Sequence, residues 1–464
     1  MKVTLNGASG GIVTGSCYLL EVEGRKILVD CGMFQGKPEI TQHNWEDFPF
    51  KASEIDFVFI THAHLDHVGR LPLLYRRGFR GTIISTDATR DLAEIIMLDA
   101  AKLHKEGIER GDISFNGRVL TEPMFDKEDI EGLMRLFKVY NYGDKIELFP
   151  NFSFRMREAG HILGSVSYEF WFNNKYGRMR KVVFSGDLGQ TGARIIRDPD
   201  FIREADYVFV ESTYGGRLHK DKSSTVLEFL GILNDVSRYR SVAIVPTFAV
   251  ERTQEILYEL NLLVEKGILR GLKYFLDSPM AIKATHIFEM YRKYYDEDAL
   301  DLIKRGDNIF QFPGLNFTQT TDESKSISLY KGGLVIMAGS GMCTGGRVLH
   351  HLKRYLPDKH AHVIFVGFQV PGTLGFKIIN GAKQVRIHGQ TVPVRAQVHT
   401  LGGFSAHADQ NDLMYWLGNF GHSPKTVFIT HGDNDNRVAL NIKVKSELGL
   451  STYLPKLNEV LDLT

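Results

Sequence analysis

The sequence predicts an α/β protein of more than one domain, in which sheets and helices form layers. Short β-branched or aromatic runs alternate with helical segments over the first 210 residues. From about residue 213 the order strand, loop, helix repeats, which is typical of a mostly parallel sheet. The third observation is length, because 464 residues exceed the size at which one hydrophobic core stops growing.

Five runs in the first part are expected to be buried strands, because they are short, apolar and rich in β-branched or aromatic residues. They are residues 26–30, 57–61, 82–86, 182–187 and 207–212. A helix is expected over residues 88–107, where apolar residues recur at three- and four-residue spacing and Gly107 ends the segment.

The second part contains four further expected strands, three of which lead through a loop into a helix. These strands are residues 241–247, 272–277, 333–341 and 362–368. The first leads into a helix expected from Thr253 to Lys266. Near the end of the chain, a strand over residues 426–430 is followed directly by His431.

The composition is that of an ordinary globular protein. The sequence holds 56 basic and 55 acidic side chains, a formal charge of +1, so any nucleic-acid binding must come from local placement of lysine and arginine. Its three cysteines form no CxxC pair, which argues against a disulfide scaffold and favours a reducing compartment. No apolar run approaches the length of a membrane span and no signal peptide is recognisable, so a cytoplasmic protein is expected.

The segment from Thr61 to His67 carries four potential metal ligands just after an expected strand. His62 and His64 are two residues apart, so an extended backbone sends both imidazoles to one side. A turn beginning at Leu65 can swing Asp66 and His67 towards a second position. Imidazole and carboxylate ligands suit Zn²⁺, so the segment can serve two metal ions at once, whereas loop histidines on a polar surface are the less favoured alternative.

Other candidate ligands stand at strand ends in the same region: Asp30, His161 in EAGHILGS and Asp187 in VFSGDLG. Together with the HxHxDH segment they resemble the metallo-β-lactamase superfamily over about the first 210 residues. The resemblance implies a four-layer αββα fold. It also implies that Asp187 bridges two metals and that Asp30 supports the ligands from behind.

Three later positions resemble the motifs of the β-CASP branch, the nucleic-acid-processing nucleases: Glu211 in VFVESTYGG, His407 in GGFSAHAD and His431 in FITHGD. That branch inserts an α/β domain on a mostly parallel sheet into the lactamase fold. The resemblance therefore implies three segments, with the first and last completing one domain: residues 1–212, 213–393 and 394–464.

Motifs inside the insert resemble RNA-cleaving members related to the catalytic subunit of the pre-mRNA 3′-end processing complex. They are PTFAVERTQE, LDSPMA, AGSGMCTGG and GFQVPGTLG. One position departs from the pattern: many of these relatives carry glycine before the arginine, where this chain has Glu251.

The resemblance implies a role for each candidate residue and two zinc ions per chain. One zinc ion would be held by His62, His64 and His161, the other by Asp66, His67 and His431, with Asp187 shared. Asp66 and Asp187 would thereby take part in catalysis, in which a hydroxide bridges the metals. His407 is the candidate general acid, and Glu211 would orient it.

Two parts of the insert are candidates for binding substrate phosphates. Ser340, Gly341 and Gly345 belong to a glycine-rich loop between a strand and a helix, although such loops are equally often tight turns. Arg252 starts a helix, where either a phosphate contact or a solvated surface position explains it. Basic clusters at residues 70–80 and 178–181 are explained as well by a solvated face as by RNA.

The predicted function is a zinc-dependent ribonuclease that cuts single-stranded RNA and leaves 5′-phosphate and 3′-hydroxyl ends. Internal cleavage and trimming from the 5′ end both remain open. The alternatives are a lactonase or thioesterase, which leaves the insert unexplained, and a DNA-processing β-CASP nuclease, whose last motif lacks a histidine. An inactive scaffold is a further alternative, but such subunits lose metal ligands that this chain keeps. No membrane partner is expected, and the sequence leaves a homodimer open.

Overall fold

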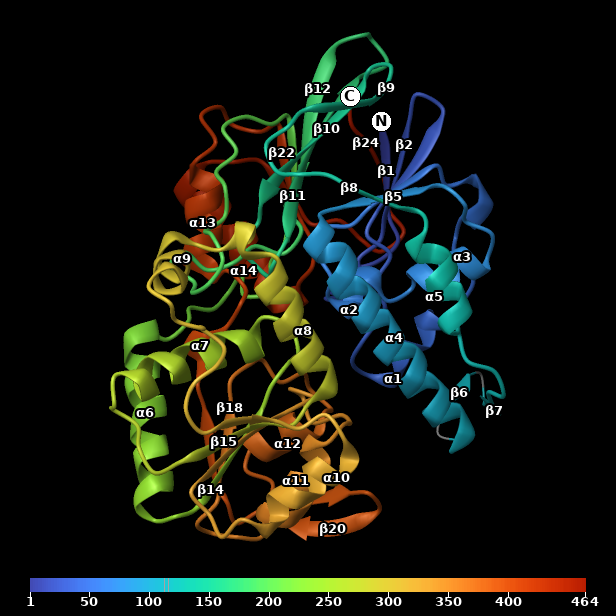
Figure 1. The fold of residues 1–464 in the computed structure, drawn as a ribbon. Helices are drawn as coiled ribbons and strands as arrows, with labels where there is room; N and C mark the ends of the chain where they lie inside the picture. The colour runs from blue at the N-terminus through green and yellow to red at the C-terminus, as the bar shows by residue number, and fades with distance from the viewer. Residues whose placement is uncertain (112, 116) are drawn as a thin grey trace. The chain divides into compact units, whose positions relative to one another are not determined.

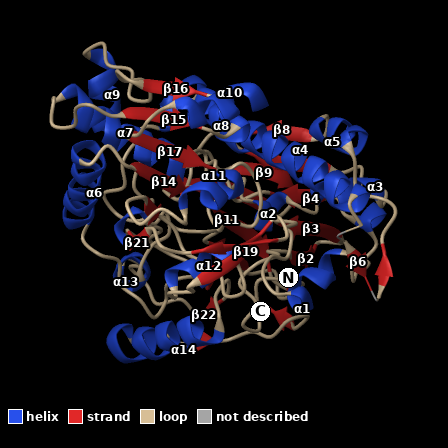
Figure 2. Cartoon of the chain, turned by 90° about the horizontal axis from the view of Figure 1, so that it is seen from below, coloured by secondary structure: helices blue, strands red, loops and turns tan. Residues whose placement is uncertain are grey.

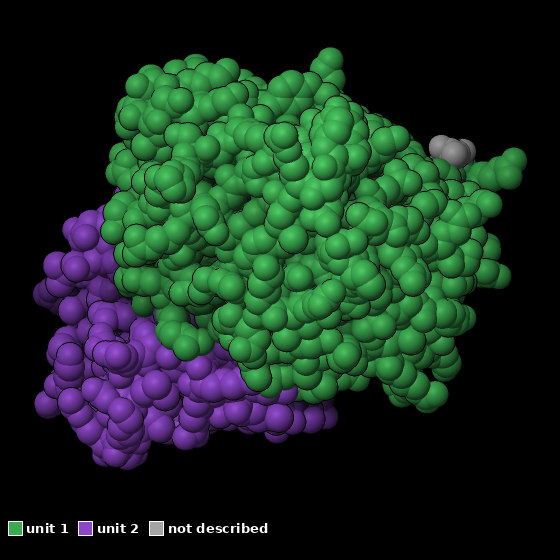
Figure 3. All heavy atoms as spheres, turned by 90° about the horizontal axis from the view of Figure 1, so that it is seen from above, with its two compact units in different colours: residues 1–193, 197–218, 407–464 green, residues 194–196, 219–406 purple. Residues whose placement is uncertain are grey.

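A computed structural model describes residues 1–111, 113–115 and 117–464. The chain forms two units, coloured separately in Figure 3. Unit 1 comprises residues 1–193, 197–218 and 407–464, and unit 2 comprises residues 194–196 and 219–406. The segment boundaries expected from the sequence, after residues 212 and 393, stay a prediction. No described helix is both long and apolar enough to cross a lipid bilayer.

Unit 1 is built around two seven-stranded sheets of mixed direction (Figure 1). The first sheet has the order β24 (Val460–Asp462), β1 (Lys2–Leu5), β2 (Tyr18–Val22), β3 (Arg25–Val29), β4 (Phe57–Phe59), β5 (Thr82–Ser85) and β8 (Phe137–Val139). The second has the order β23 (Thr452–Tyr453), β22 (Thr426–Ile429), β13 (Tyr207–Val210), β12 (Met179–Phe184), β11 (Val166–Asn173), β10 (Phe152–Glu158) and β9 (Ile146–Phe149).

An aromatic core joins these two sheets. Every second side chain is buried and apolar on β10 from Phe152 to Met156 and on β11 from Val166 to Phe172, as expected for strands with one face turned to a core. Phe59 of β4 meets them edge-on, with its ring centroid 5.0 Å from Phe154, 5.1 Å from Tyr168 and 4.9 Å from Phe170. Packing of this kind excludes water and fixes how the two sheets face each other.

Helices cover the other faces of the two sheets, which completes the αββα layering expected from the sequence. On the second sheet, Val208 and Val210 of β13 belong to a separate core with Leu413 and Leu440. Figure 1 shows α3, α4 and α5 gathered beside the first sheet. The helices of unit 1 are α1 (Pro38–Thr41), α2 (Leu65–Val68), α3 (Leu71–Arg76), α4 (Asp87–Glu109), α5 (Lys127–Met134), α13 (Gln410–Gly418) and α14 (Asn434–Lys443). The expected helix over residues 88–107 is confirmed as α4.

Unit 2 contains the expected parallel sheet, of which β16, β15, β17 and β14 lie side by side in Figure 2. Its order is β16 (Leu315–Phe317), β15 (Lys273–Leu276), β17 (Leu334–Ala338), β14 (Val242–Pro246), β18 (His362–Phe365) and β21 (Gln397–Thr400), and every pairing is parallel. Its helices are α6 (Lys222–Arg238), α7 (Arg252–Glu265), α8 (Pro279–Met290), α9 (Glu297–Lys304), α10 (Thr321–Ser326), α11 (Val348–Tyr355) and α12 (Leu374–Ile379). Because β21 pairs with β18, this unit continues beyond residue 393.

The remaining elements are short. Two hairpins are formed by β6 (Ser114–Phe115) with β7 (Arg118–Val119) and by β19 (Gln384–Ile387) with β20 (Gln390–Pro393). The 3₁₀ turns are Gln42–Asn44, Ala52–Glu54, Arg292–Tyr294, Ile327–Leu329 and Gly402–Phe404, and a π-helical turn spans Val444–Leu448.

Candidate metal centre

The HxHxDH segment changes conformation halfway along, and this separates its ligands into two groups. β4 ends at Phe59, and His64 is still extended, with φ −64° and ψ 149°. α2 begins at Leu65, so Asp66 and His67 lie on its first turn. His62 and His64 therefore point to one place, while Asp66 and His67 point to another, as the spacing predicted.

The first group consists of three imidazoles and one carboxylate. The Nδ1 atom of His64 lies 3.1 Å from Nε2 of His62 and 3.1 Å from Nε2 of His161. Oδ2 of Asp187 lies 3.5 Å from Nε2 of His62 and 3.7 Å from Nε2 of His161. Ligands at about 2.0–2.1 Å from a tetrahedral Zn²⁺ are about 3.3–3.4 Å apart, so these four atoms fit one zinc ion.

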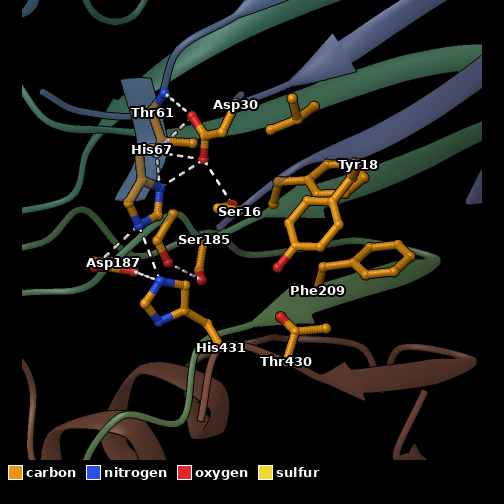
Figure 4. A pocket seen from close by; sticks show the side chains of 13 residues that line it. Ser16, Tyr18, Asp30, Thr61, His67, Ser185, Asp187, Phe209, Thr430 and His431 are labelled. Carbon is orange, nitrogen blue, oxygen red and sulfur yellow. Dashed lines mark hydrogen bonds and ion pairs between the residues drawn. The ribbon is translucent and has the colours of Figure 1, made fainter. Parts of the chain in front are cut away.

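The second group consists of two imidazoles and a carboxylate from opposite ends of the chain. Nε2 of His67 lies 3.0 Å from Nε2 of His431, which in turn lies 3.6 Å from Oδ2 of Asp66. Asp187 reaches this group too, with Oδ1 3.6 Å from Nε2 of His431 and Oδ2 3.5 Å from Nε2 of His67. Figure 4 shows Asp187 beside both rings.

The donor atoms fit metal ions better than they fit each other. Asp187 is 2% exposed, and its Oδ1 atom has no hydrogen-bond partner among the described residues. Ring nitrogens of His62, His64 and His161 converge on one another and on the Asp187 carboxylate. A buried carboxylate oxygen without a hydrogen-bond donor, beside several converging ring nitrogens, is what a cation site requires.

The protonation states differ between the two groups. In the second group burial lowers the pKa of His67 and of His431, but neighbouring carboxylates, Asp187 first, outweigh it and raise both above the ordinary value. In the first group the protonation states favour a bound metal ion. Burial lowers the pKa of His62 well below its ordinary value and that of His64 to about 4, so both rings are neutral, the form that binds metal. Burial raises the pKa of Asp187, but His431, His67 and His62 outweigh it and hold this pKa well below the ordinary value. The carboxylate is therefore ionised.

Asp30 holds His67 from behind. It follows β3 with a φ of 60° and is 1% exposed. Nδ1 of His67 lies 2.7 Å from Asp30 Oδ2, to which Ser16 also donates, and the Thr61 amide donates to Oδ1 (Figure 4). A proton held on Nδ1 leaves Nε2 of His67 free for a metal ion.

His407 stands at the edge of the cluster, held by Glu211. Nδ1 of His407 lies 3.3 Å from Oε1 of Glu211, which also accepts from the Leu188 amide. Burial lowers the pKa of His407, but Glu211 and then Asp187 outweigh it and raise the pKa above its ordinary value. The side chain is 22% exposed, and its Nδ1 is 3.9 Å from Oδ2 of Asp187. His407 can therefore carry a proton next to the candidate metal ligands.

The candidate phosphate-binding residues lie in unit 2. Ser340, Gly341 and Gly345 lie between β17 and α11, as predicted, and the Ser340 hydroxyl accepts from the Thr344 amide. A side chain at Gly341 would come within 2.7 Å of the Phe248 ring, so glycine is required there for packing.

Arg252 is not the solvated surface arginine that one of the two interpretations describes, and the phosphate contact stays a prediction. It is 5% exposed and pairs through Nη1 with Glu255, so it is not a solvated arginine. That ion pair also occupies part of the guanidinium fork on which a bidentate phosphate contact depends. The burial of Arg252 depends on the packing of α7, which the sequence pattern does not reveal.

Sequence reasoning missed three hydroxyl groups that orient the ligands. Ser16 and Thr61 bind Asp30, and Oγ1 of Thr213 lies 3.3 Å from Nδ1 of His431. Thr61 and Thr213 are each within two residues of a predicted site residue, so proximity to a motif was an available signal. Ser16 lies in a loop with no pattern that distinguishes it.

Comparison with known proteins gives three matching family models. They are the metallo-beta-lactamase superfamily over residues 10–140, the Beta-Casp domain over residues 253–378, and the Zn-dependent metallo-hydrolase RNA specificity domain over residues 391–455. Together they extend over most of the sequence and cover both units.

Curated relatives match over nearly the whole chain. Ribonuclease TTHA0252 of Thermus thermophilus is 41% identical over 428 residues, which is 92% of this chain and 92% of that protein. Transcription termination factor FttA of Methanosarcina mazei is 30% identical over 94% of this chain and 68% of that protein. The same factor from Methanocaldococcus jannaschii is 28% identical over 95% of this chain and 68% of that protein.

A solved structure has a similar fold. A protein of unknown function from Enterococcus faecalis superposes with a TM-score of 0.53 at 12% identity, covering 100% of this chain and 99% of that one. At this identity the match concerns the fold alone.

Proposed function

The chain belongs to the β-CASP family of metallo-β-lactamase-type RNA nucleases, and we propose that it cleaves single-stranded RNA with two zinc ions held by seven side chains. One ion would be held by His62, His64 and His161 and the other by Asp66, His67 and His431, and Asp187 would be a ligand available to both. The observation that carries this proposal is the position of Asp187, whose two oxygens lie within 3.7 Å of ring nitrogens in both groups.

Zinc at such a site activates water near neutral pH and neutralises the negative charge that develops on the phosphate during hydrolysis. The protein's own contribution to the leaving group is a proton. His407 donates the proton on Nε2 to the departing 3′ oxygen of the ribose, while its Nδ1–H remains bound to Glu211. The products of this step are a 3′-hydroxyl and a 5′-phosphate.

Glu211 serves as a positioning residue. It is 1% exposed and is itself held by the amides of Leu188 and Thr213, so its carboxylate has little freedom to turn. An anion fixed in this way keeps the Nδ1 proton of His407 in place and favours the charged ring.

The decisive experiment offers the zinc-loaded protein four substrates: an RNA, a DNA of the same sequence, a lactone and a thioester. Cleavage of the RNA alone is expected, and its loss after chelation should be reversed by added zinc. Efficient lactone or thioester hydrolysis without RNA cleavage would overturn the assignment.

The same RNA with a 5′-triphosphate or a 5′-monophosphate then distinguishes the two modes of cleavage. Release of mononucleotides from the monophosphate form alone indicates an exonuclease. Discrete internal fragments from both forms indicate an endonuclease.

The proposed setting is the reducing cytoplasm, because the three cysteines of the chain are buried and none forms a disulfide in the part that the structure describes. A homodimer stays a prediction, to be tested by sedimentation of the zinc-loaded protein.

A further inference from the structure

A pocket of unit 1, separate from the one in Figure 4, adjoins the loops that carry Asp187 and His407. It has a volume of about 180 Å³ and is lined by Leu188 and Ala408, the residues that follow those two in sequence. The Ala408 amide donates to the Leu188 carbonyl, so this backbone pair connects the pocket with the site. None of its lining residues is among the candidate metal ligands or the proton donor.

Aromatic side chains form much of the wall. Phe201 and Tyr415 meet edge to face with ring centroids 5.1 Å apart, and they are 40% and 57% exposed. Trp416 is 3% exposed, and its Nε1–H donates to the Asp200 carbonyl. The indole therefore has its polar atom satisfied and contributes ring surface to the pocket.

Two carboxylates complete the lining. Asp412 accepts from the amides of Thr191 and Asp409, and Asp198 accepts from the Gly192 amide. Among the described residues, none forms an ion pair with either carboxylate, and the pocket lining includes no lysine, arginine or histidine. The pocket thus combines exposed ring faces with negative charge that has no cationic partner.

A cation in the pocket would stabilise the ionised form of the Asp412 carboxylate. Burial, and after it the charge of Asp409, raise the pKa of the Asp412 carboxyl above its ordinary value. A positive group in the pocket would offset both effects, whereas an RNA phosphate would be repelled by the carboxylates.

From this geometry we propose that the pocket between α13 and residues 198–201 receives an arginine side chain from a partner protein. A guanidinium has the required chemistry, because its flat face stacks on aromatic rings while its edge donates to carboxylates. A lysine ammonium carries the same charge but lacks the planar face, so it should bind more weakly.

The test uses the zinc-loaded full chain and follows Trp416 emission during titration with Nα-acetyl-arginine amide. The corresponding citrulline, lysine and adenosine compounds serve as comparison probes. We expect saturable binding of the arginine compound with a dissociation constant in the millimolar range, and binding of citrulline at least about 10-fold weaker, since charge and cation–π contact together contribute on the order of 1.4 kcal/mol. Trp416→Phe should abolish the signal.

Variants assign the binding to the pocket. Asp412→Asn and Tyr415→Ala should each weaken arginine binding about 5- to 10-fold while ribonuclease activity stays unchanged. If Asp412→Asn lowers the thermal stability of the protein, Asp198→Asn provides a second variant that removes a negative charge from the pocket lining. Asp322→Asn, an exposed carboxylate of unit 2, is the matched charge control and should have no effect.

Three outcomes would overturn the proposal. The first is citrulline binding as tightly as arginine, which would remove the need for charge. The second is adenosine saturating the pocket in preference to arginine, which would make it a base-binding subsite of the RNA path. The third is no saturable binding of arginine, or binding that neither the Asp412 and Asp198 variants nor the Tyr415 variant weakens.

Discussion

Metal binding and proton donation are assigned to different residues of the candidate metal centre, and His407 allows the clearest test of this assignment. Its ring is held by Glu211 and lies outside both groups of converging ligands. His407→Ala should therefore keep its full zinc content and slow RNA cleavage by about 10²–10⁴-fold. Metal analysis and single-turnover kinetics check the two halves of this prediction, and zinc loss in the variant would contradict it.

Glu211→Gln provides the matched variant for the pH profile of this residue. The neutral amide removes the Glu211 contribution that raises the pKa of His407. The alkaline limb of the rate profile, where the acid loses its proton, should then move to lower pH. An unchanged alkaline limb would mean that His407 is not the titrating acid.

Asp187 should behave in the opposite way from His407. Its two oxygens lie next to ring nitrogens of both groups, so Asp187→Ala removes a ligand from each position at once. Bound zinc and RNA cleavage should fall together, as measured by elemental analysis and activity on one preparation. A variant with two zinc ions and normal rate would exclude Asp187 from the bridge.

Glu158, at the end of β10, makes the free energy of unfolding depend on pH. Burial raises its pKa to about 8, although the Gly160 amide and Arg197 act in the opposite direction. The folded state thus holds a proton that the unfolded chain releases near its ordinary pKa of 4.5. The stability contribution is fully present below about pH 4.5 and is lost as the pH rises towards about 8.

The test compares the wild type with Glu158→Gln in urea unfolding at several pH values and constant zinc. Between pH 5 and pH 8 the wild type should lose on the order of 3 kcal/mol relative to the variant. Parallel pH curves for the two proteins would exclude this assignment.

At the scale of single elements, the start of α7 shows why one sequence departure matters. Glu251 adopts φ 65° and ψ −58°, a region that favours glycine, and it occupies the position where the sequence resemblance leads one to expect glycine. Glu251→Gly should therefore be more stable than Glu251→Ala by about 1 kcal/mol, because both variants lose the side chain and only glycine relieves the backbone. Thermal denaturation of the two variants measures this difference, and equal melting temperatures would contradict the inference that the backbone at residue 251 is strained.

The elements also show what the sequence could predict. The positions of the strands were predictable because buried strands are short apolar runs, and ligands that follow such runs come together, as His62 after β4 of the first sheet and Asp187 and His431 after β12 and β22 of the second sheet do. β4 ends two residues earlier than expected, since the backbone must leave the sheet before His62. The burial of Arg252 and the extension of unit 2 through β21 depend on contacts between distant segments, which local periodicity does not encode.

On the scale of the whole molecule, the candidate metal ligands connect the last part of the chain to the first. His431 follows β22, while His67 lies in the turn after β4, and their Nε2 atoms are 3.0 Å apart. At a free zinc concentration 1,000 times the dissociation constant, each zinc ion that binds as proposed would stabilise the folded state by about 4.1 kcal/mol. The candidate ligands all belong to unit 1, so this stabilisation should be confined there.

Removal of zinc should therefore affect the two units unequally. Hydrogen exchange of the chelated protein should show faster exchange around residues 61–68 and along β22 and α14, with unchanged protection in β14 and β17 of unit 2. Adding zinc back should restore the slow exchange. Asp187→Ala is the control, because chelation should change its exchange pattern far less. Equal loss of protection in both units would show that the ions stabilise the chain globally rather than through this one centre.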